Sequence, residues 1–270
     1  MLTFLRGILL LVFGLYVLAS LFAFFFSDRM IFQPQPSGYR DDAGIIKLTS
    51  RNGAKISAKY LANPGATFTI LFSHGNAEDI GDDETLLEGL RDAGFAVFAY
   101  DYQGYGTSEG KPSERNAYED ADAAYDYLVQ TLHISPNRII AFGRSVGGGP
   151  ATDLAVRRPV AGLILESSFT SAFRVMTGIR FLPFDKFNNL GKIRRVRCPV
   201  LVIHGTRDSV INSSHGRQLF AAANDPKLSL WVENANHNDV SSVGGAIYYD
   251  SLKKFAALVQ EFQRDTSSAT

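Results

Sequence analysis

The sequence predicts an α/β fold in which a mostly parallel sheet of eight strands is covered by helices on both faces. Short apolar stretches rich in β-branched residues alternate with amphipathic stretches along most of the chain. This order is typical of parallel strands joined by helices. The first two predicted strands follow each other directly, which adds an antiparallel edge. With 270 residues, 46% of them hydrophobic, the chain is long enough for one large domain with a full core.

Each predicted strand is a short apolar run that ends at turn residues. The strands are predicted at 45–50, 55–61, 67–72, 95–100, 138–142, 162–165, 199–204 and 228–232. Asn52 and Gly53 separate the first two strands, and this dipeptide favours a tight hairpin turn. The helices are predicted at 79–93, 113–132, 148–158, 213–223 and 246–262. Gly94 is expected to end the first helix and Ser113 to cap the second.

The N-terminus holds an uncharged, apolar segment from Gly7 to Phe26. A helix of this length spans about 30 Å, which is the thickness of the hydrocarbon core of a bilayer. We therefore expect residues 1–26 to form a transmembrane anchor, residues 27–44 a linker, and residues 45–265 the folded domain. A signal peptide cleaved after Ala19 and a buried core helix are the alternatives.

The charges that flank this segment predict its orientation. Arg6 and the α-amino group precede the segment, whereas the charges of Asp28 and Arg29 cancel after it. Because positively charged flanks tend to stay on the cytoplasmic side, we expect the N-terminus in the cytosol. The chain is then a single-pass membrane protein with its folded domain on the extracytoplasmic side.

A long interruption separates two of the later strands, at residues 167–196. It is too apolar for an ordinary surface loop, with aromatic and sulfur-containing side chains at Phe169, Phe173, Met176, Phe181, Phe184 and Phe187. We interpret it as a lid insertion or the wall of a pocket. A segment that simply packs on the core is the alternative.

One serine lies between a predicted buried strand and a helix, in the sequence Gly143-Arg144-Ser145-Val146-Gly147. A sharp turn there strains the serine backbone, and a glycine two positions away on each side relieves the crowding. The serine Oγ is then presented at the carboxyl end of the sheet and at a helix N-terminus. We predict that Ser145 is a nucleophile, and a structural glycine-rich turn is the alternative. The role of Arg144 is left open.

A serine hydroxyl needs a base to remove its proton, usually a histidine that is held by a carboxylate. Asp208 follows the predicted strand at 199–204, and His237 follows the next strand along the chain. Both lie at the carboxyl edge of the sheet, where ligand sites form in open α/β sheets. We therefore predict that His237 is the base and Asp208 the carboxylate. The alternative acids are Glu166, Glu233 and Asp239.

The oxyanion that forms during acyl transfer needs backbone N–H donors. In this strand-turn-helix arrangement one donor is the residue after the nucleophile, which is Val146. The second is expected in the loop after the strand at 67–72, where we predict Asn76 and keep Gly75 and Ala77 as neighbouring alternatives. The other histidines are expected to be structural at His74 and His204, and to lie at the surface at His133 and His215.

Composition argues against several other classes of protein. Lysine plus arginine equals aspartate plus glutamate, at 27 each, so the chain lacks the basic footprint of a nucleic-acid binder. The single cysteine, Cys198, and the wide spacing of the histidines leave no zinc-ligand pattern. Gly104, Gly106 and Gly110 nearly form a dinucleotide fingerprint, but the third glycine comes one residue late. We therefore expect neither a cofactor nor a metal.

The predicted nucleophile, acid and base follow two further motifs in an order that is known from other proteins. Ser145, Asp208 and His237 follow the segments SHGNAED and YDYQGYGTSEG, and together they resemble the α/β-hydrolase superfamily over residues 45–262. Within it the chain is similar to membrane-anchored serine hydrolases with a small lid, a branch that includes acyl-protein thioesterases that remove palmitate. Those thioesterases carry an acylated, cysteine-rich N-terminus, whereas here an apolar segment takes the anchoring role.

This resemblance implies the α/β-hydrolase fold and the hydrolysis of carboxylic esters or thioesters through an acyl-enzyme. The predicted anchor and the aromatic insertion favour an acylated or lipid-like substrate at a membrane. Two alternatives stay open. One is a serine peptidase on the same fold, and the other is a membrane-tethered binding protein without catalytic activity.

Overall fold

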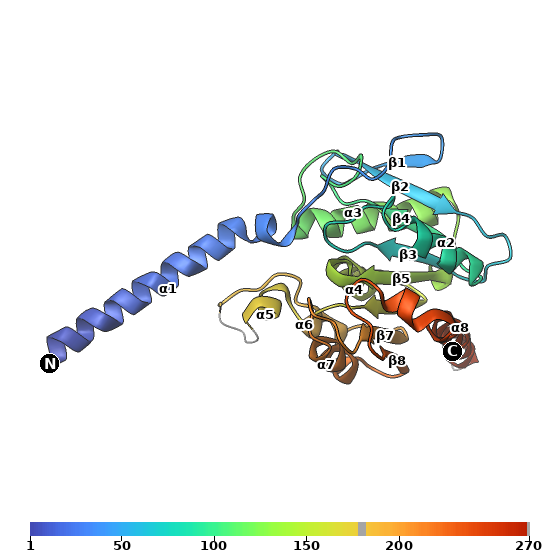
Figure 1. The fold of residues 1–270 in the computed structure, drawn as a ribbon. Helices are drawn as coiled ribbons and strands as arrows, with labels where there is room; N and C mark the ends of the chain where they lie inside the picture. The colour runs from blue at the N-terminus through green and yellow to red at the C-terminus, as the bar shows by residue number, and fades with distance from the viewer. Residues whose placement is uncertain (178–181, 269–270) are drawn as a thin grey trace.

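The strands form one sheet in the order β1-β2-β4-β3-β5-β6-β7-β8, with helices on both sides (Figure 1). The computed structural model describes residues 1–177 and 182–268. From β4 to β8 neighbouring strands run parallel, whereas β2 is antiparallel to both β1 and β4. The predicted fold class, with its antiparallel N-terminal edge, is confirmed.

The strand bounds lie within a few residues of the predicted ones. The strands are β1 (Ile45–Thr49), β2 (Lys55–Leu61), β3 (Thr69–Ser73), β4 (Ala96–Tyr100), β5 (Ile139–Arg144), β6 (Gly162–Glu166), β7 (Val200–Gly205) and β8 (Lys227–Val232). The helices are α1 (Leu2–Ile31), α2 (Glu84–Asp92), α3 (Glu114–Asp126), α4 (Gly148–Arg157), α5 (Ala172–Thr177), α6 (Asn189–Ile193), α7 (Ser214–Ala222) and α8 (Val240–Ser268).

The central strands are buried on both faces, and their side chains alternate between two cores. On β5, Ile140 and Phe142 enter the core beneath α2 and α8, whereas Ile139 and Ala141 enter the core beneath α3, α4 and α7. This alternation follows from the two-residue period of a strand. Because both faces are packed, the carboxyl end of β5 is a rigid support for the residues that follow it.

Three predicted helices differ from the observed ones by more than one residue at an end. Helix α2 begins at Glu84 because the Asp79 carboxylate accepts hydrogen bonds from the amides of Gly81 and Asp82, at 2.8 and 3.1 Å. Ser113 caps α3 as predicted, but α3 ends at Asp126 and a π-helical turn, Tyr127–Thr131, continues it. Helix α8 begins at Val240 and kinks at Gly245, where φ is +48°, one residue before its predicted start.

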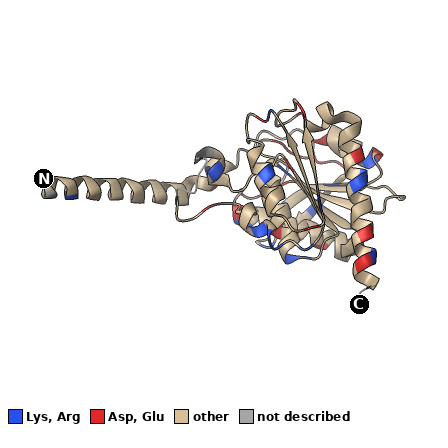
Figure 2. Ribbon diagram, turned by 90° about the horizontal axis from the view of Figure 1, so that it is seen from below, with Lys and Arg blue, Asp and Glu red and all other residues tan. Residues whose placement is uncertain are grey.

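The N-terminal helix is longer than the predicted span. Helix α1 continues through Ile31, so the start of the segment expected to be a linker is helical. The stretch Thr3–Ile31 is long and apolar enough to cross a membrane, and its most apolar window of 18 residues has a mean hydropathy of 2.7. Charged side chains are sparse along α1 and gather on the rest of the chain (Figure 2).

The rest of the predicted linker lies against the folded domain. Phe32 is buried, and its ring meets the rings of Tyr102 and Phe187 at centroid distances of 6.4 and 5.8 Å. Further on, the amide of Gly38 donates to Asp79 and the Tyr39 hydroxyl donates to Asp101, at 2.7 and 2.5 Å. These contacts join residues 32–39 of the predicted linker to the folded domain. The prediction missed them because each contact joins residues that are far apart in sequence.

The insertion at residues 167–196 contributes to both a core and a cavity. Phe187 is fully buried in the core, whereas Phe169 and Phe173 line a cavity that is described below. Two short helices, α5 and α6, lie within the insertion and were not predicted. Phe181 and the side chain of Met176 lie outside the described residues, and the division of the chain into an anchor, a linker and a domain with a lid stays a prediction.

Candidate active site

Ser145 occupies a strained turn between β5 and α4. Its φ angle is +52°, in the left-handed region that costs a residue with a side chain about 1–3 kcal/mol. The flanking glycines allow this turn. A Cβ atom at Gly147 would overlap the carbonyl oxygen of Ser73, and one at Gly143 would overlap the carbonyl oxygen of Gly147. Both glycines are therefore required for the close approach of β5, β3 and α4.

The structure brings the predicted serine, histidine and aspartate into one hydrogen-bonded chain. Nε2 of His237 lies 2.9 Å from the Oγ atom of Ser145, and Nδ1 of His237 lies 2.8 Å from Oδ2 of Asp208. All three residues are at least nine-tenths buried. This geometry allows the imidazole to take the serine proton while the carboxylate orients the ring.

Asp208 is held in its ionised form by several donors. Its Oδ1 atom accepts from the amides of Val210 and Ile211, at 2.9 and 2.7 Å, and Nε2 of His204 lies 3.2 Å from its Oδ2 atom. Burial alone would raise the pKa of the Asp208 carboxyl, but the hydrogen bonds from His204, His237 and Ile211 hold it well below its usual range. His204, expected to be structural, thus supports the carboxylate.

The alternative acids have other partners. Glu166 accepts a hydrogen bond of 2.6 Å from the Tyr248 hydroxyl, and Asp239 accepts one of 2.6 Å from the amide of Asn236. The carboxylate of Glu233 lies 3.4 Å from the Thr206 hydroxyl. The carboxylate that contacts Nδ1 of His237 is that of Asp208.

The loop between β3 and α2 carries Asn76 beside Ser145. Asn76, Ser145 and Val146 line the same cavity. The amide of Gly75 donates to the Glu78 carboxylate at 2.6 Å, so it is engaged within the loop. The Asn76 side chain is also fixed, because its Oδ1 atom accepts from the Tyr105 hydroxyl at 2.7 Å. The amide of Asn76 thus stays a better candidate donor for an oxyanion than that of Gly75.

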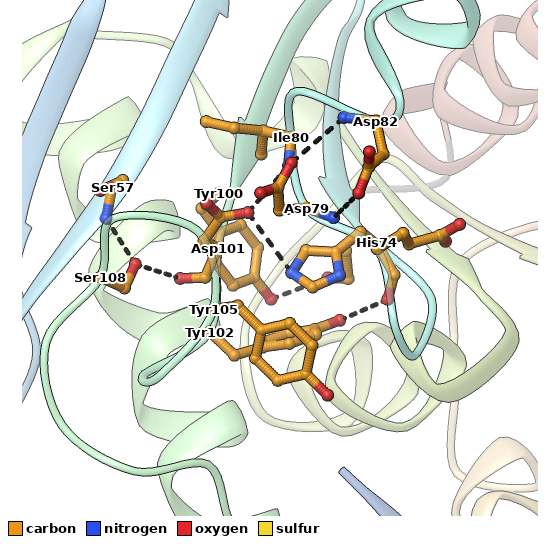
Figure 3. A network of polar contacts seen from close by, with 12 residues as sticks. Ser57, His74, Asp79, Ile80, Asp82, Tyr100, Asp101, Tyr102, Tyr105 and Ser108 are labelled. Atoms are coloured by element: carbon orange, nitrogen blue, oxygen red, sulfur yellow. Dashed lines mark hydrogen bonds and ion pairs between the residues drawn. The ribbon is translucent and has the colours of Figure 1, made fainter. Parts of the chain in front are cut away.

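A buried polar network contacts the loop between β3 and α2 (Figure 3). The Tyr102 hydroxyl donates to the carbonyl of His74 at 2.8 Å, and the amide of Ile80 donates to Asp101 at 2.9 Å. Nε2 of His74 lies 3.6 Å from Oδ1 of Asp101. Burial lowers the pKa of His74 to about 4 and raises that of Asp101 to about 7, so at pH 5–6 neither group is charged. His74 is fully buried within this network, and the structural role expected for it stays a prediction.

Two other histidines were expected at the surface. His133 is exposed. His215 is instead half-buried, and its Nδ1 atom lies 2.9 Å from the Thr170 hydroxyl at the start of the insertion. The expectation for His215 was wrong because its partner comes from a segment 45 residues away, which local polarity does not reveal.

Arg144, whose role the sequence left open, is buried among three carboxylates. Its guanidinium lies 2.8 Å from Asp83, 3.3 Å from Glu78 and 3.6 Å from Glu166. Burial, together with the nearby Glu78 carboxylate, raises the pKa of the Asp83 carboxyl to about 8. Because Glu78 also holds the amide of Gly75, Arg144 joins the turn at Ser145 to the Asn76 loop. The sequence carried no signal for this cluster.

A cavity of about 650 Å³ opens above Ser145. This volume is within the range of about 300–1,000 Å³ that is common for small-molecule sites. Its walls are apolar and come from α1, from the insertion, and from the loop after Asp208. Among the described residues, no group of three or more His, Cys, Asp or Glu side chains could hold a metal ion.

A mostly parallel sheet with a serine, a histidine and an aspartate linked at its carboxyl edge defines the class of α/β hydrolases. The family profile described as "Serine aminopeptidase, S33" matches residues 65–186. The α/β-hydrolase domain-containing protein 17B of Xenopus laevis is 45% identical over 217 residues, which cover 79% of this chain and 74% of that protein. The human protein of that name is 43% identical over 222 residues, 81% of this chain and 76% of the human one. The chain belongs to the α/β-hydrolase domain-containing protein 17 family.

Solved structures with low sequence identity share the fold. The esterase Pf2001 of Pyrococcus furiosus superposes with a TM-score of 0.71 at 19% identity, over 83% of this chain and 98% of the esterase. A monoacylglycerol lipase of Paleococcus ferrophilus gives a TM-score of 0.60 at 21% identity, over 76% of this chain and 98% of the lipase. At these identities the likeness concerns the fold alone.

Proposed function

We propose that the protein is a serine hydrolase that cleaves carboxylic ester or thioester bonds of acylated or lipid-like substrates at a membrane. The observation that carries the proposal is the contact of Ser145 with His237 and of His237 with Asp208, at 2.9 and 2.8 Å, beside an apolar cavity that Ser145 lines. Membership of an α/β-hydrolase family supports the same conclusion.

In the proposed reaction, Nε2 of His237 takes the proton of Ser145 while the serine Oγ atom attacks the acyl carbonyl carbon. The amides of Val146 and Asn76 stabilise the oxyanion, and the imidazolium returns its proton to the leaving alcohol or thiol. A water molecule, deprotonated by His237, then attacks the acyl-enzyme and releases the carboxylic acid and free Ser145. Asp208 orients the imidazole and stabilises its charged form throughout.

The apolar α1 helix supports a location at a membrane. In the proposed topology α1 crosses the bilayer once, with the N-terminus in the cytosol and the catalytic domain on the extracytoplasmic side. Arg6 before the apolar segment, and the cancelling charges of Asp28 and Arg29 after it, support this orientation. This orientation is tested by introducing a cysteine on each side of the apolar segment and labelling it in intact and in permeabilised cells.

A serine peptidase is the second candidate, because the matching family profile is described as a serine aminopeptidase. The same three residues could cleave an amide. A panel of p-nitrophenyl acyl esters, acyl thioesters and aminoacyl p-nitroanilides discriminates between the two. Preferential turnover of the esters and thioesters, abolished by Ser145→Ala, is the expected result; preferential turnover of the anilides would reject the esterase in favour of the peptidase.

A further inference from the structure

The cavity above Ser145 is partly built by the N-terminal helix. Ala19, Phe22, Ala23, Ser27 and Met30 of α1 all line it. Apart from the adjacent pair Phe22 and Ala23, these residues follow one another at intervals of three or four, so they lie on one face of the helix. From Ala19 to Met30 this face runs along the cavity for about 16 Å.

Helix α1 is fixed in this position by contacts at its C-terminal end. The carboxylate of Asp28 lies 3.1 Å from the Lys186 ammonium and accepts from the amide of Glu114 at 3.2 Å. The ring of Phe24 meets that of Phe184, in the insertion, edge to face at 5.6 Å. The helix is therefore joined to both the domain and the insertion beside the cavity.

The composition of this face suits an acyl chain. Small side chains at Ala19, Ala23 and Ser27 leave space beside the helix, and Ser145 lies in the same cavity. Ser27 is 1% exposed, and its hydroxyl has no hydrogen-bond partner within the described part of the chain. A polar group of a bound molecule could provide that partner, since buried hydroxyls without one are costly.

We propose that α1 forms a wall of the substrate site and sets the length of the acyl chain that the site accepts. The chain of a membrane-resident ester or thioester lies along the face that contains Ala19 and Ala23, with its carbonyl at Ser145. Because Ala19, Phe22 and Ala23 belong to the apolar segment, the chain reaches the site from the hydrocarbon layer without crossing water. The inference rests on the proposed function.

The test compares two tryptophan substitutions at neighbouring depths of α1. Ala23→Trp fills the cavity, whereas Leu21→Trp places the same side chain at an exposed position, 48% accessible, on the opposite side of the helix. The full chain is purified in one detergent, and kcat/KM is measured for p-nitrophenyl acetate and p-nitrophenyl dodecanoate. We expect Ala23→Trp to lower the dodecanoate-to-acetate ratio by at least about tenfold, since excluded methylenes are costly in an apolar pocket. Leu21→Trp should leave the ratio unchanged.

A variant with the opposite effect guards against a disrupted fold. Phe22→Ala removes a side chain from the same wall and so enlarges the cavity. It should therefore raise kcat/KM for p-nitrophenyl hexadecanoate relative to that for p-nitrophenyl dodecanoate. If the wild-type protein hydrolyses the esters but Ala23→Trp and Leu21→Trp give the same ratio, α1 does not form the wall and the inference fails alone. If the wild-type protein hydrolyses none of the esters, the proposed function fails and the inference fails with it.

Discussion

Replacing Arg144 by methionine is expected to destabilise the folded protein strongly. The substitution keeps an unbranched side chain but leaves Glu78, Asp83 and Glu166 without their buried cation. Removing one partner of a buried ion pair costs about 3–5 kcal/mol, because the remaining charge is uncompensated. In a protein of this size 1 kcal/mol corresponds to about 2–4 °C, so the melting temperature should fall by about 6–20 °C.

The deficit should also depend on pH, with a defined sign. In the wild-type protein the pKa of Asp83 is raised to about 8 and that of Glu166 is raised as well, chiefly by burial. The folded state therefore binds more protons than the unfolded state from about pH 4 to pH 8, and stability falls as the pH rises through that window. Without Arg144 these pKa values rise further, so the loss of stability should be larger at pH 8 than at pH 5.5.

The assay is thermal unfolding of the detergent-solubilised full chain at both pH values, followed by intrinsic fluorescence. Arg91→Met is the matched control, because Arg91 is 38% exposed and its ion pairs with Glu88 and Asp92 lie at the surface. Such pairs contribute at most about 1 kcal/mol. Adding Asp83→Asn to Arg144→Met should recover part of the loss. Equal melting temperatures for the two methionine variants, or a deficit that does not grow with pH, would refute the reasoning.

Three further substitutions test other parts of the site. Asp208→Asn should lower kcat by about 10⁴-fold without unfolding the protein, because the imidazole loses its orienting carboxylate; a loss below tenfold on the best ester would contradict this. Gly147→Ala should lower the free energy of unfolding by about 3 kcal/mol, since its Cβ would overlap Ser73. Gly65→Ala, whose Cβ would meet only the Asn63 side chain at an ordinary contact distance of 3.6 Å, should change it little in the same melting assay. Phe187→Ala should lower the free energy of unfolding by about 3–5 kcal/mol, because it leaves a cavity in the core. An unchanged melting temperature would contradict the position of Phe187 in the core.

Much of the fold is encoded in local patterns, and those patterns predicted it. Strands and helices differ in patterns that extend over only a few residues, so local sequence is enough to predict them. For example, β2 spans the predicted residues 55–61. The turn at Ser145 was predictable because glycines at 143 and 147 combine with a strand before and a helix after. The order of Asp208 and His237 along the chain places them at the same edge of the sheet, which made their pairing predictable from the sequence.

Features that depend on long-range contacts could not be predicted in this way. The carboxylates around Arg144 come from the loop before α2, the N-cap of α2 and the end of β6, and they converge only in the folded chain. The docking of α1 also escaped prediction. An apolar helix that lines a cavity has the same composition as one that faces lipid, and the Asp28–Lys186 contact joins residues 158 positions apart.

Covalent labelling of Ser145 tests the central claim most directly. A fluorophosphonate reacts with a serine only when a base activates the hydroxyl and the oxyanion is stabilised. The folded full-length protein should be labelled with one probe per chain, the modified peptide should contain Ser145, and Ser145→Ala and His237→Ala should abolish the reaction. A folded wild-type protein that stays unlabelled, or labelling that persists in Ser145→Ala, would contradict the assignment of Ser145 as the nucleophile.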